Sequence, residues 1–288
     1  MITGIYCANV YKLEGCMSLK AMYNEIAGHY ATADRFGSIS DSHQAAIAQI
    51  KKEHLGRKPH YKVLDFGVGN GAFLSKLRSC MPEADFTGID ISKEMLALAH
   101  KALPLKTIEA SATEASHYLP HHSQDLVLAH FINAYIPIHT LFHEADLLTR
   151  SNGYFSLITT TYESFPVAQQ QLADFIGQGS ILSTVVGHYY KAMVKNTTVA
   201  SGVDELMRVF AQHKFEVIEH QRIQIPVILQ DIDELALFGI DGTWFLNSIS
   251  MRMLPKNFLI QRLKRLFGQI FTFPYHDTHI IDVILAKK

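Results

Sequence analysis

The spacing of hydrophobic residues changes along the chain, and each change predicts a different kind of element. Hydrophobic residues recur at helical spacing from residue 18 to 55, with a polar break at 32–43, so two helices are expected there. Beyond residue 61, short runs of branched and aromatic residues alternate with helical stretches. The expected strands are 61–66, 85–89, 106–110, 124–129 and 153–161, and the expected helices are 71–80, 92–102 and 138–149. Strands separated by helices predict a parallel sheet with helices on both faces.

The pattern becomes less regular after residue 162. The elements expected there are helices at 165–176, 180–195 and 202–215 and strands at 215–225 and 279–286. Helical spacing also fills residues 231–271, between the last two strands. An insertion of that length inside a strand pair is usually functional, for example as a lid.

These elements predict one domain over residues 18–288 with two helical additions. The additions are an N-terminal helical cap at 18–57 and the insertion, or lid, at 231–271, and residues 1–17 are expected to form a disordered tail. The start of the chain has neither a basic segment nor a continuous apolar run, so no signal peptide is expected, and Met17 is an alternative first residue. No stretch approaches the roughly 18 consecutive apolar residues that span a bilayer.

A glycine-rich segment, VLDFGVGNGAF at residues 63–73, follows directly on the strand expected at 61–66. Gly67, Gly69 and Ala72 fit the dinucleotide pattern G-x-G-x-x-[GA], in which the backbone approaches a ligand closely at a strand-to-helix turn. Asp90, at the end of the next expected strand, lies where an acid can bind a ribose. The glycines alone therefore leave the choice of nucleoside cofactor open.

Asp65 separates the possible cofactors. It lies two residues before the first glycine, in an otherwise apolar strand. A carboxylate there would repel a pyrophosphate placed at the helix N-terminus. It would suit a ligand that carries an ammonium group and a sulfonium centre, such as S-adenosyl-L-methionine, whose ribose would bind Asp90.

The same residues resemble the motifs of a known family. VLDFGVGNGAFLSKL looks like the first motif of class I S-adenosylmethionine-dependent methyltransferases, D-x-G-x-G-x-G, at Asp65, Gly67, Gly69 and Gly71. FTGIDISKEMLALAHKAL is similar to their second motif, which ends in the ribose-binding acid Asp90, and HSQDLVLAHFINAYIP resembles the fourth-strand motif and the loop after it.

The resemblance covers about residues 20–230 and 275–288. It implies a Rossmann-like, seven-stranded, mostly parallel sheet that ends in an antiparallel strand, and S-adenosyl-L-methionine as the cofactor. It also implies a small-molecule methyltransferase, a type that includes enzymes acting on carboxyl groups and on carrier-bound acids.

The resemblance also assigns residues to the cofactor. Many members have an acid after the third strand that accepts a hydrogen bond from the adenine amino group, and here Ser111 or Thr113 would take that role. Ile91 and Met95 are expected to pack on the adenine ring. The expected cofactor-binding residues are Asp65, Gly67, Gly69, Gly71, Asp90, Ile91, Met95, Ser111, Ala112, His130 and Phe131.

Methyl transfer is an in-line displacement, so the protein chiefly aligns the acceptor and excludes water. A carboxylate or a neutral amine needs no base, whereas a hydroxyl acceptor does. The catalytic candidates are His130, just past the fourth strand, and Tyr30; the alternative role of His130 is to bond locally and shape the cofactor site. The residues expected near substrate are Tyr23, Asn133, Tyr135 and Trp244.

The insertion allows two interpretations. Trp244, the only tryptophan, lies there among other large apolar residues, either as a lid over substrate or as part of a small satellite core. Residues 256–265 are basic and amphipathic, which fits either a carrier protein or lipid surface as partner or a solvated outer face.

Composition narrows the partners further. The 26 Lys and Arg residues almost balance the 27 Asp and Glu residues, so no overall field draws in nucleic acid. Cys7, Cys16 and Cys80 lack metal-binding or redox spacing, which suits the reducing cytoplasm. Although His139 and His143 are four residues apart, no acid or cysteine completes a set, so no metal is expected.

Together these features predict transfer of a methyl group from S-adenosylmethionine to an O or N atom of a small, partly apolar molecule, with a carboxylate among the candidates. One alternative is a non-catalytic protein that binds S-adenosylmethionine for regulation or interaction. Another is an NAD-dependent dehydrogenase that uses the same glycine loop. The sequence leaves the oligomeric state open.

Overall fold

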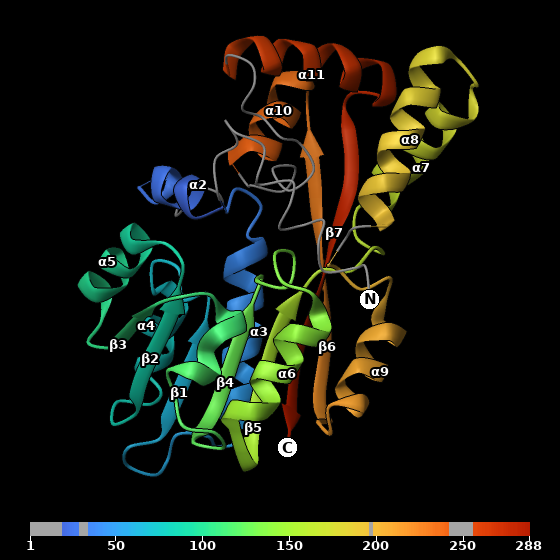
Figure 1. Ribbon diagram of the computed structural model, residues 1–288. Coiled ribbons are helices and arrows are strands. Elements are labelled where there is room, and N and C mark those ends of the chain that lie inside the picture. The colour runs from blue at the N-terminus through green and yellow to red at the C-terminus, as the bar shows by residue number, and fades with distance from the viewer. Residues whose placement is uncertain (1–18, 29–33, 196–197, 242–255) are drawn as a thin grey trace.

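The fold is built around one mixed sheet, described by a computed structural model for residues 19–28, 34–195, 198–241 and 256–288 (Figure 1). The strand order is β3-β2-β1-β4-β5-β7-β6, in which β1 to β5 run parallel and β7 is antiparallel to both of its neighbours. The strands are β1 Lys62–Phe66, β2 Asp85–Asp90, β3 Lys106–Glu109, β4 Gln124–His130, β5 Thr149–Thr159, β6 Glu216–Leu229 and β7 Tyr275–Lys287. The predicted fold class, a seven-stranded and mostly parallel sheet, is confirmed.

Helices cover both faces of this sheet. One face carries α3 (Ser38–Lys52), α4 (Ala72–Arg78) and α5 (Lys93–Ala102), and the other carries η2 (Ala112–His117), α6 (Ile138–Leu148) and α9 (Val203–Gln212). Side chains alternate between the faces along each strand. In β4, Leu126 and Leu128 belong to the core beneath α3, α4 and α5, while Val127 and Ala129 belong to the core beneath η2, α6 and α9. Because both faces are covered, the parallel strands are almost continuously apolar.

Phenylalanine rings fill the core between α6, α9 and the sheet. Phe142 is fully buried and meets Phe210 and Phe155 edge to face, with ring centroids 4.7 and 5.1 Å apart. Phe215 packs on Phe155 at 5.2 Å. The rings join α6 and α9 to β5, which supports the antiparallel end of the sheet.

The strands β6 and β7 extend beyond the rest of the sheet as a two-stranded ribbon (Figure 1). β7 pairs with β5 only as far as Asp282, but it pairs with β6 all the way to Tyr275. Both strands are longer than the expected 215–225 and 279–286 because the ribbon supports the insertion. Four helices surround it: α7 (Pro166–Gly177), α8 (Ile181–Lys195), α10 (Ile232–Asp241) and α11 (Lys256–Ile270).

The described part of the insertion forms a small core of its own on this ribbon. Val227, Leu229, Leu235, Phe238 and Tyr275 are its buried members. In the basic stretch 256–265, Lys264 forms an ion pair with Asp233 of α10, so at least this cation faces a neighbouring helix. Helices α10 and α11 therefore pack on the ribbon, while Trp244, the residue on which the lid and satellite-core interpretations rest, lies outside the described residues.

The two N-terminal helices have different positions. Helix α2 (Leu19–Ile26) lies beside α5 at the carboxyl edge of the sheet, whereas α3 packs on the sheet face against β7 (Figure 1). Helix α3 also begins inside the expected polar break, because the Asp34 carboxylate accepts hydrogen bonds from the backbone N–H of Ile39 and Ser40, both 2.8 Å long. Of the expected cap at 18–57, only α2 covers that edge.

Two further expectations concern the limits of the chain. The tail expected at 1–17 lies outside the described residues. Within the described ranges, no helix is long and apolar enough to cross a bilayer.

Truncation of Phe142 tests the core on which the sheet's antiparallel end depends. We expect Phe142→Ala to lower the free energy of unfolding by about 3–5 kcal/mol, because a fully buried ring leaves a cavity. The measurement is urea unfolding followed by circular dichroism. As the control, Tyr118→Ala removes a ring that is 52% exposed and should change stability by about 0.5 kcal/mol at most. Equal losses in the two variants would contradict this description of the core.

Candidate functional site

The carboxyl ends of β1, β2 and β4 meet at one edge of the sheet, and the glycine loop crosses that edge. Gly67, Gly69 and Gly71 all have positive φ, at +69°, +53° and +77°. At Gly71 a side chain would also press on α5, since an added Cβ would lie 3.0 Å from the Ala99 Cα. This glycine is thus required for packing within the protein.

Gly69 differs from Gly71 because, among the described residues, it faces open space. An added Cβ there would find only the Gly67 carbonyl oxygen, at 4.0 Å. The Gly69 N–H donates a 2.9 Å hydrogen bond to the Asp90 carboxylate. The middle of the loop therefore leaves room beside an acidic side chain, as a bound ligand would require.

Asp90 organises the backbone around this space. Its carboxylate accepts the bond from Gly69 and a second one, 2.8 Å long, from the Ser92 N–H at the start of α5. Burial raises its pKa, although these backbone hydrogen bonds act in the opposite direction. A carboxylate has about four acceptor positions, so capacity remains for the two hydroxyl groups of a ribose.

Asp65 is the second acid of the site and is 4% exposed. Burial raises its pKa well above the ordinary range, and the nearby Asp90 carboxylate adds to the effect. Two carboxylates next to open space favour a cationic or hydroxyl-bearing ligand and disfavour a phosphate.

The residues expected at the adenine ring differ in how far their side chains are exposed. Ser111 caps η2, where its Oγ accepts a 3.2 Å bond from the Thr113 N–H. Ala112 and Met95 are 5% and 1% exposed, so they form the floor of this region, while Ile91 keeps an accessible side chain. An adenine ring would thus meet Ile91 and the Ser111 hydroxyl before the two buried residues.

Helix α2 crosses this edge and contacts three of the loops that follow strands. The Tyr23 hydroxyl donates a 2.6 Å hydrogen bond to the Tyr135 hydroxyl after β4, and the Ser92 hydroxyl donates a 2.7 Å bond to Asn24 Oδ1. Lys20 forms an ion pair with Glu109 at the end of β3. Sequence reasoning missed Asn24, which no pattern marks, and Ser92, which stands in the N-cap position and could have been found from it.

His130 lies at the end of β4, where its ring is partly buried and its Nδ1 is fully buried. Its Nε2 is 3.1 Å from the Ser156 Oγ, and its ring meets Phe73 edge-on with centroids 4.3 Å apart. Burial holds its pKa well below the ordinary value of 6.5, and His43, 6.0 Å away between ring centroids, contributes to the same shift. This environment fits the local, site-shaping role better than that of a strong base.

The loop after β4 is strained where it leaves the strand. Phe131 has a φ of +56°, and its N–H donates a 2.7 Å bond to the Ile158 carbonyl. A left-handed conformation is costly for a bulky residue and concentrates at functional sites. Two residues on, Asn133 is 2% exposed and accepts a 2.5 Å bond from the Thr159 hydroxyl. Its Nδ2 has no hydrogen-bond partner among the described residues.

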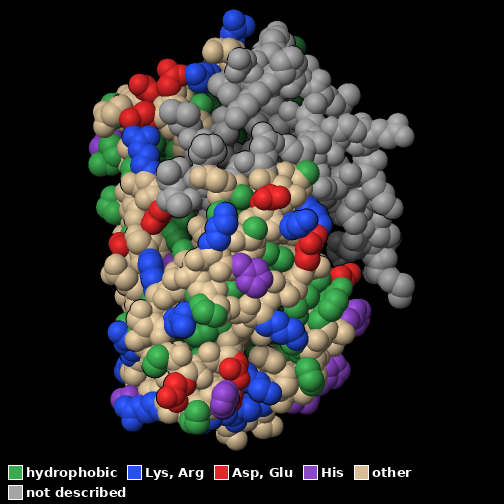
Figure 2. All heavy atoms as spheres, turned by 90° about the vertical axis from the view of Figure 1, so that its left-hand side faces the viewer, with side chains coloured by type: hydrophobic (Ala, Val, Ile, Leu, Met, Phe, Trp, Pro, Cys, Tyr) green, Lys and Arg blue, Asp and Glu red, His purple; other side chains and the backbone are tan. Residues whose placement is uncertain are grey.

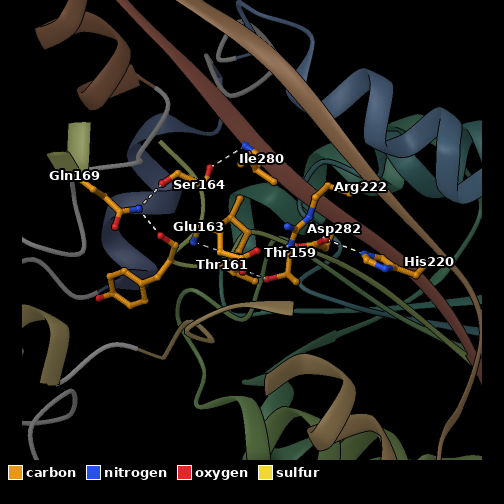
Figure 3. Close-up of polar contacts among 11 residues, drawn as sticks. Thr159, Thr161, Glu163, Ser164, Gln169, His220, Arg222, Ile280 and Asp282 are labelled. Carbon is orange, nitrogen blue, oxygen red and sulfur yellow. Dashed lines mark hydrogen bonds and ion pairs between the residues drawn. The ribbon is translucent and has the colours of Figure 1, made fainter. Parts of the chain in front are cut away.

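A polar network joins the loop after β5 to the neighbouring strands β6 and β7 (Figure 3). Fully buried Asp282 accepts bonds from His220 Nε2 at 2.8 Å and from Arg222 Nε at 2.9 Å. Arg222 in turn forms an ion pair with Glu163, 2.5 Å long. Although burial opposes ionisation, these bonds hold the pKa of Asp282 below its usual value, so the network keeps its charges and fixes the loop. Sequence reasoning missed it.

Two expected site residues, Tyr30 and Trp244, lie outside the described residues. Among the residues that the structure describes, no three His, Cys, Asp or Glu side chains are grouped so as to hold a metal ion.

Comparison with known proteins relates this geometry to other chains. Residues 63–153 match the model of a family described as a methyltransferase domain. A curated relative, the release factor glutamine methyltransferase of Deinococcus radiodurans, is 29% identical over 92 residues, which are 32% of this chain. Those residues cover 33% of that relative, so the chain matches about a third of its length.

Solved structures of low sequence identity share the fold. A candidate methyltransferase from Bacillus halodurans superposes with a TM-score of 0.54 at 12% identity, covering 84% of this chain and 98% of that one. A candidate sarcosine dimethylglycine methyltransferase from Galdieria sulphuraria gives 0.52 at 11% identity, covering 86% and 85%.

Replacement of Asp65 by Asn tests the electrostatics of the site without any ligand. Because the pKa of Asp65 in the folded chain exceeds its ordinary value of 3.8, the ionised carboxyl destabilises the folded state at pH values above about 3.8. We expect ligand-free Asp65→Asn to be more stable than the parent at neutral pH, by about 1 kcal/mol or more. The gain should shrink as the pH falls and vanish below about 3.8.

The measurement is urea unfolding of both proteins across this pH range. Asp85→Asn, at a side chain 57% exposed, is the matched control and should show no such gain. A less stable Asp65→Asn at neutral pH would show that the ionised carboxylate is already compensated in the ligand-free protein.

Proposed function

We propose that this chain is a class I S-adenosylmethionine-dependent methyltransferase, which transfers a methyl group from S-adenosylmethionine to an O or N atom of a small, partly apolar molecule; the methyltransferase-domain match over residues 63–153 supports this. The observation that carries the proposal is a pair of acids next to the glycine loop, buried Asp65 and partly buried Asp90, where Gly69 meets open space among the described residues. Two such acids suit a ligand with an ammonium group and a ribose, and a pyrophosphate would be repelled.

The residues at this edge fit the cofactor group by group. Asp90 would accept the ribose hydroxyls while it keeps its bonds to the glycine loop and to α5. Asp65 would pair with the ammonium group, which would offset the burial that now raises its pKa. Ile91 and Ser111 would meet the adenine. The likeness to methyltransferase folds supports this placement.

When bound, S-adenosylmethionine supplies a methyl group on a positively charged sulfur; the acceptor's lone pair forms the new bond to carbon as the carbon–sulfur electrons return to sulfur. The chain's own task is alignment and the exclusion of water. Helix α2 suits the second task, because Lys20, Tyr23 and Asn24 hold it across the loops after β3, β4 and β2.

The polar groups near the expected methyl position favour acceptors that need no base. His130 is neutral, but its pKa is held well below 6.5, so it would take a proton from a hydroxyl poorly. Asn133 has an amide N–H₂ group without a hydrogen-bond partner in the part of the chain that the structure describes, and this group could orient an acceptor oxygen. Carboxylates and neutral amines are therefore the first acceptors to test, and His130 is assigned to positioning.

The surface agrees with a small-molecule substrate. On the face that includes β3 and α5, the described Lys and Arg side chains are interspersed with Asp and Glu (Figure 2). This visible part therefore offers no continuous basic groove of the kind that follows a nucleic-acid backbone.

Cofactor binding is the first test. We expect isothermal titration calorimetry to show binding of S-adenosylhomocysteine, and Asp90→Ala to weaken it by about tenfold or more, because hydrogen bonds to a charged group are lost. The control is Asp85→Ala, a change at the exposed start of the same strand, which should leave the affinity unchanged. Failure to bind, or tighter binding of NADH, would overturn the cofactor assignment.

Turnover separates an enzyme from a protein that only binds the cofactor. We expect transfer of a labelled methyl group to at least one member of an acceptor set of small acids, amines and phenols, with acids or amines as the better acceptors. Mass spectrometry of the products identifies the methylated atom. Tight cofactor binding with no transfer to any acceptor would favour the non-catalytic alternative.

A further inference from the structure

We infer that His43 and His130 together bind a carboxylate, and that this carboxylate belongs to the amino-acid end of the cofactor. The inference rests on the proposed function and assigns to α3 a part in the cofactor site. His43 lies in the second turn of α3, and none of the sequence motifs includes it.

The two imidazoles both contact the ring of Phe73 at the carboxyl edge of β1 and β4. Phe73, in the first turn of α4, meets His130 at 4.3 Å and His43 at 5.0 Å between ring centroids, both edge to face. The two imidazole centroids are 6.0 Å apart. Each ring has a buried Nδ1 with no hydrogen-bond partner among the described residues. Buried polar atoms without a hydrogen-bond partner are costly unless a ligand pairs with them.

The surroundings of these nitrogens favour an anionic oxygen. The Ser156 hydroxyl can donate to His130 Nε2, which leaves the ring proton on Nδ1, where it can be donated. The charged side chains that act on His43 are Lys76 and Asp34. Asp34 is already engaged by two N–H groups at the start of α3, so Lys76 is the charge that remains to act on a ligand. N–H donors with a cation nearby suit a carboxylate.

The position of Asp65 identifies which carboxylate this would be. Asp65 pairs with Leu128 in the parallel register of β1 and β4, and His130 lies two residues beyond Leu128. In a strand, residues two apart point to the same face, so His130 is a diagonal neighbour of Asp65. An amino acid carries its ammonium and carboxylate groups on one carbon, and here an acid lies beside His130, whose Nδ1 can donate, with the His43 ring next to it.

Burial shifts the pKa of the acid and the pKa values of the two imidazoles in opposite directions. Burial raises the pKa of Asp65, and it lowers the pKa of His43 to about 4. All three side chains are therefore held toward their neutral forms without a ligand. A zwitterion placed between them would compensate the acid with its ammonium group and the imidazoles with its carboxylate.

The test compares two ligands that differ only in the carboxylate. S-adenosylhomocysteine carries it, and the decarboxylated analogue, S-adenosyl-3-thiopropylamine, keeps the nucleoside, sulfur and ammonium group. We expect the parent protein to bind S-adenosylhomocysteine about tenfold or more tightly than the analogue by calorimetry, as loss of hydrogen bonds to a charged group implies. In His43→Ala this ratio should fall by about fivefold or more, with little change in the affinity for the analogue.

Two further variants separate binding from packing. His43→Asn retains an N–H donor near the Nδ1 position and should restore part of the ratio. His279→Ala removes another buried histidine on the same face, one whose Nδ1 is hydrogen-bonded to Ser38 at 2.8 Å, and should leave the ratio unchanged even if stability falls.

Each outcome bears on a different claim. If the parent binds neither ligand, the proposed function fails. If it binds both equally, or if His43→Ala weakens both to the same degree, the inference alone is overturned, and the space between the imidazoles holds water or serves packing. If the ratio is kept in His43→Ala but the KM rises only for carboxylic acid acceptors, the carboxylate bound there is the acceptor's, and our assignment to the cofactor is wrong.

Discussion

The hydrogen bonds that the Asp90 carboxylate accepts from the Gly69 and Ser92 N–H groups are the constraint on which the rest of the site depends. They fix the glycine loop after β1 to the turn after β2, so two separate strand ends become one surface. Ser92 continues the connection, because its hydroxyl accepts a bond from the Met95 N–H and donates one to Asn24 of α2. A single partly buried acid thus couples the loop, helix α5 and the helix that covers the site.

Several titratable side chains of the site are buried without a partner that would stabilise their charged forms. Burial pushes Asp65 and Asp90 toward protonation and holds His43 and His130 neutral, so the unliganded edge carries groups whose charged forms are disfavoured. Such groups reduce the stability of the free protein, and they become favourable only when a ligand of complementary charge arrives. We therefore expect the site to select a zwitterionic ligand without a phosphate group.

The parts around the edge are joined by contacts between segments far apart in the chain. Arg35 forms a 2.6 Å ion pair with Glu234, and Phe36 meets Phe238 edge to face, so the segment before α3 is held to the insertion helix α10. Phe165, after β5, approaches the same Phe238 ring. The segment before α3, the loop after β5 and helix α10 of the insertion thus converge around the Phe238 ring.

The sheet, its helices and the cofactor motif could be predicted from the sequence. The strands and helices follow from the spacing of hydrophobic residues within each segment. The D-x-G-x-G-x-G motif and the acid at the end of the next strand are likewise patterns along the chain. Neither prediction requires knowing which segments meet in the fold. The pairing of Tyr23 with Tyr135, the packing of His43 beside His130 and the Asp282 network were decided by tertiary structure. Each unites residues that lie 60 or more positions apart, and no periodicity encodes such an encounter. Likewise, α3 lies on the sheet face and not in the cap because its buried side chains find partners on β7, a strand from the other end of the chain.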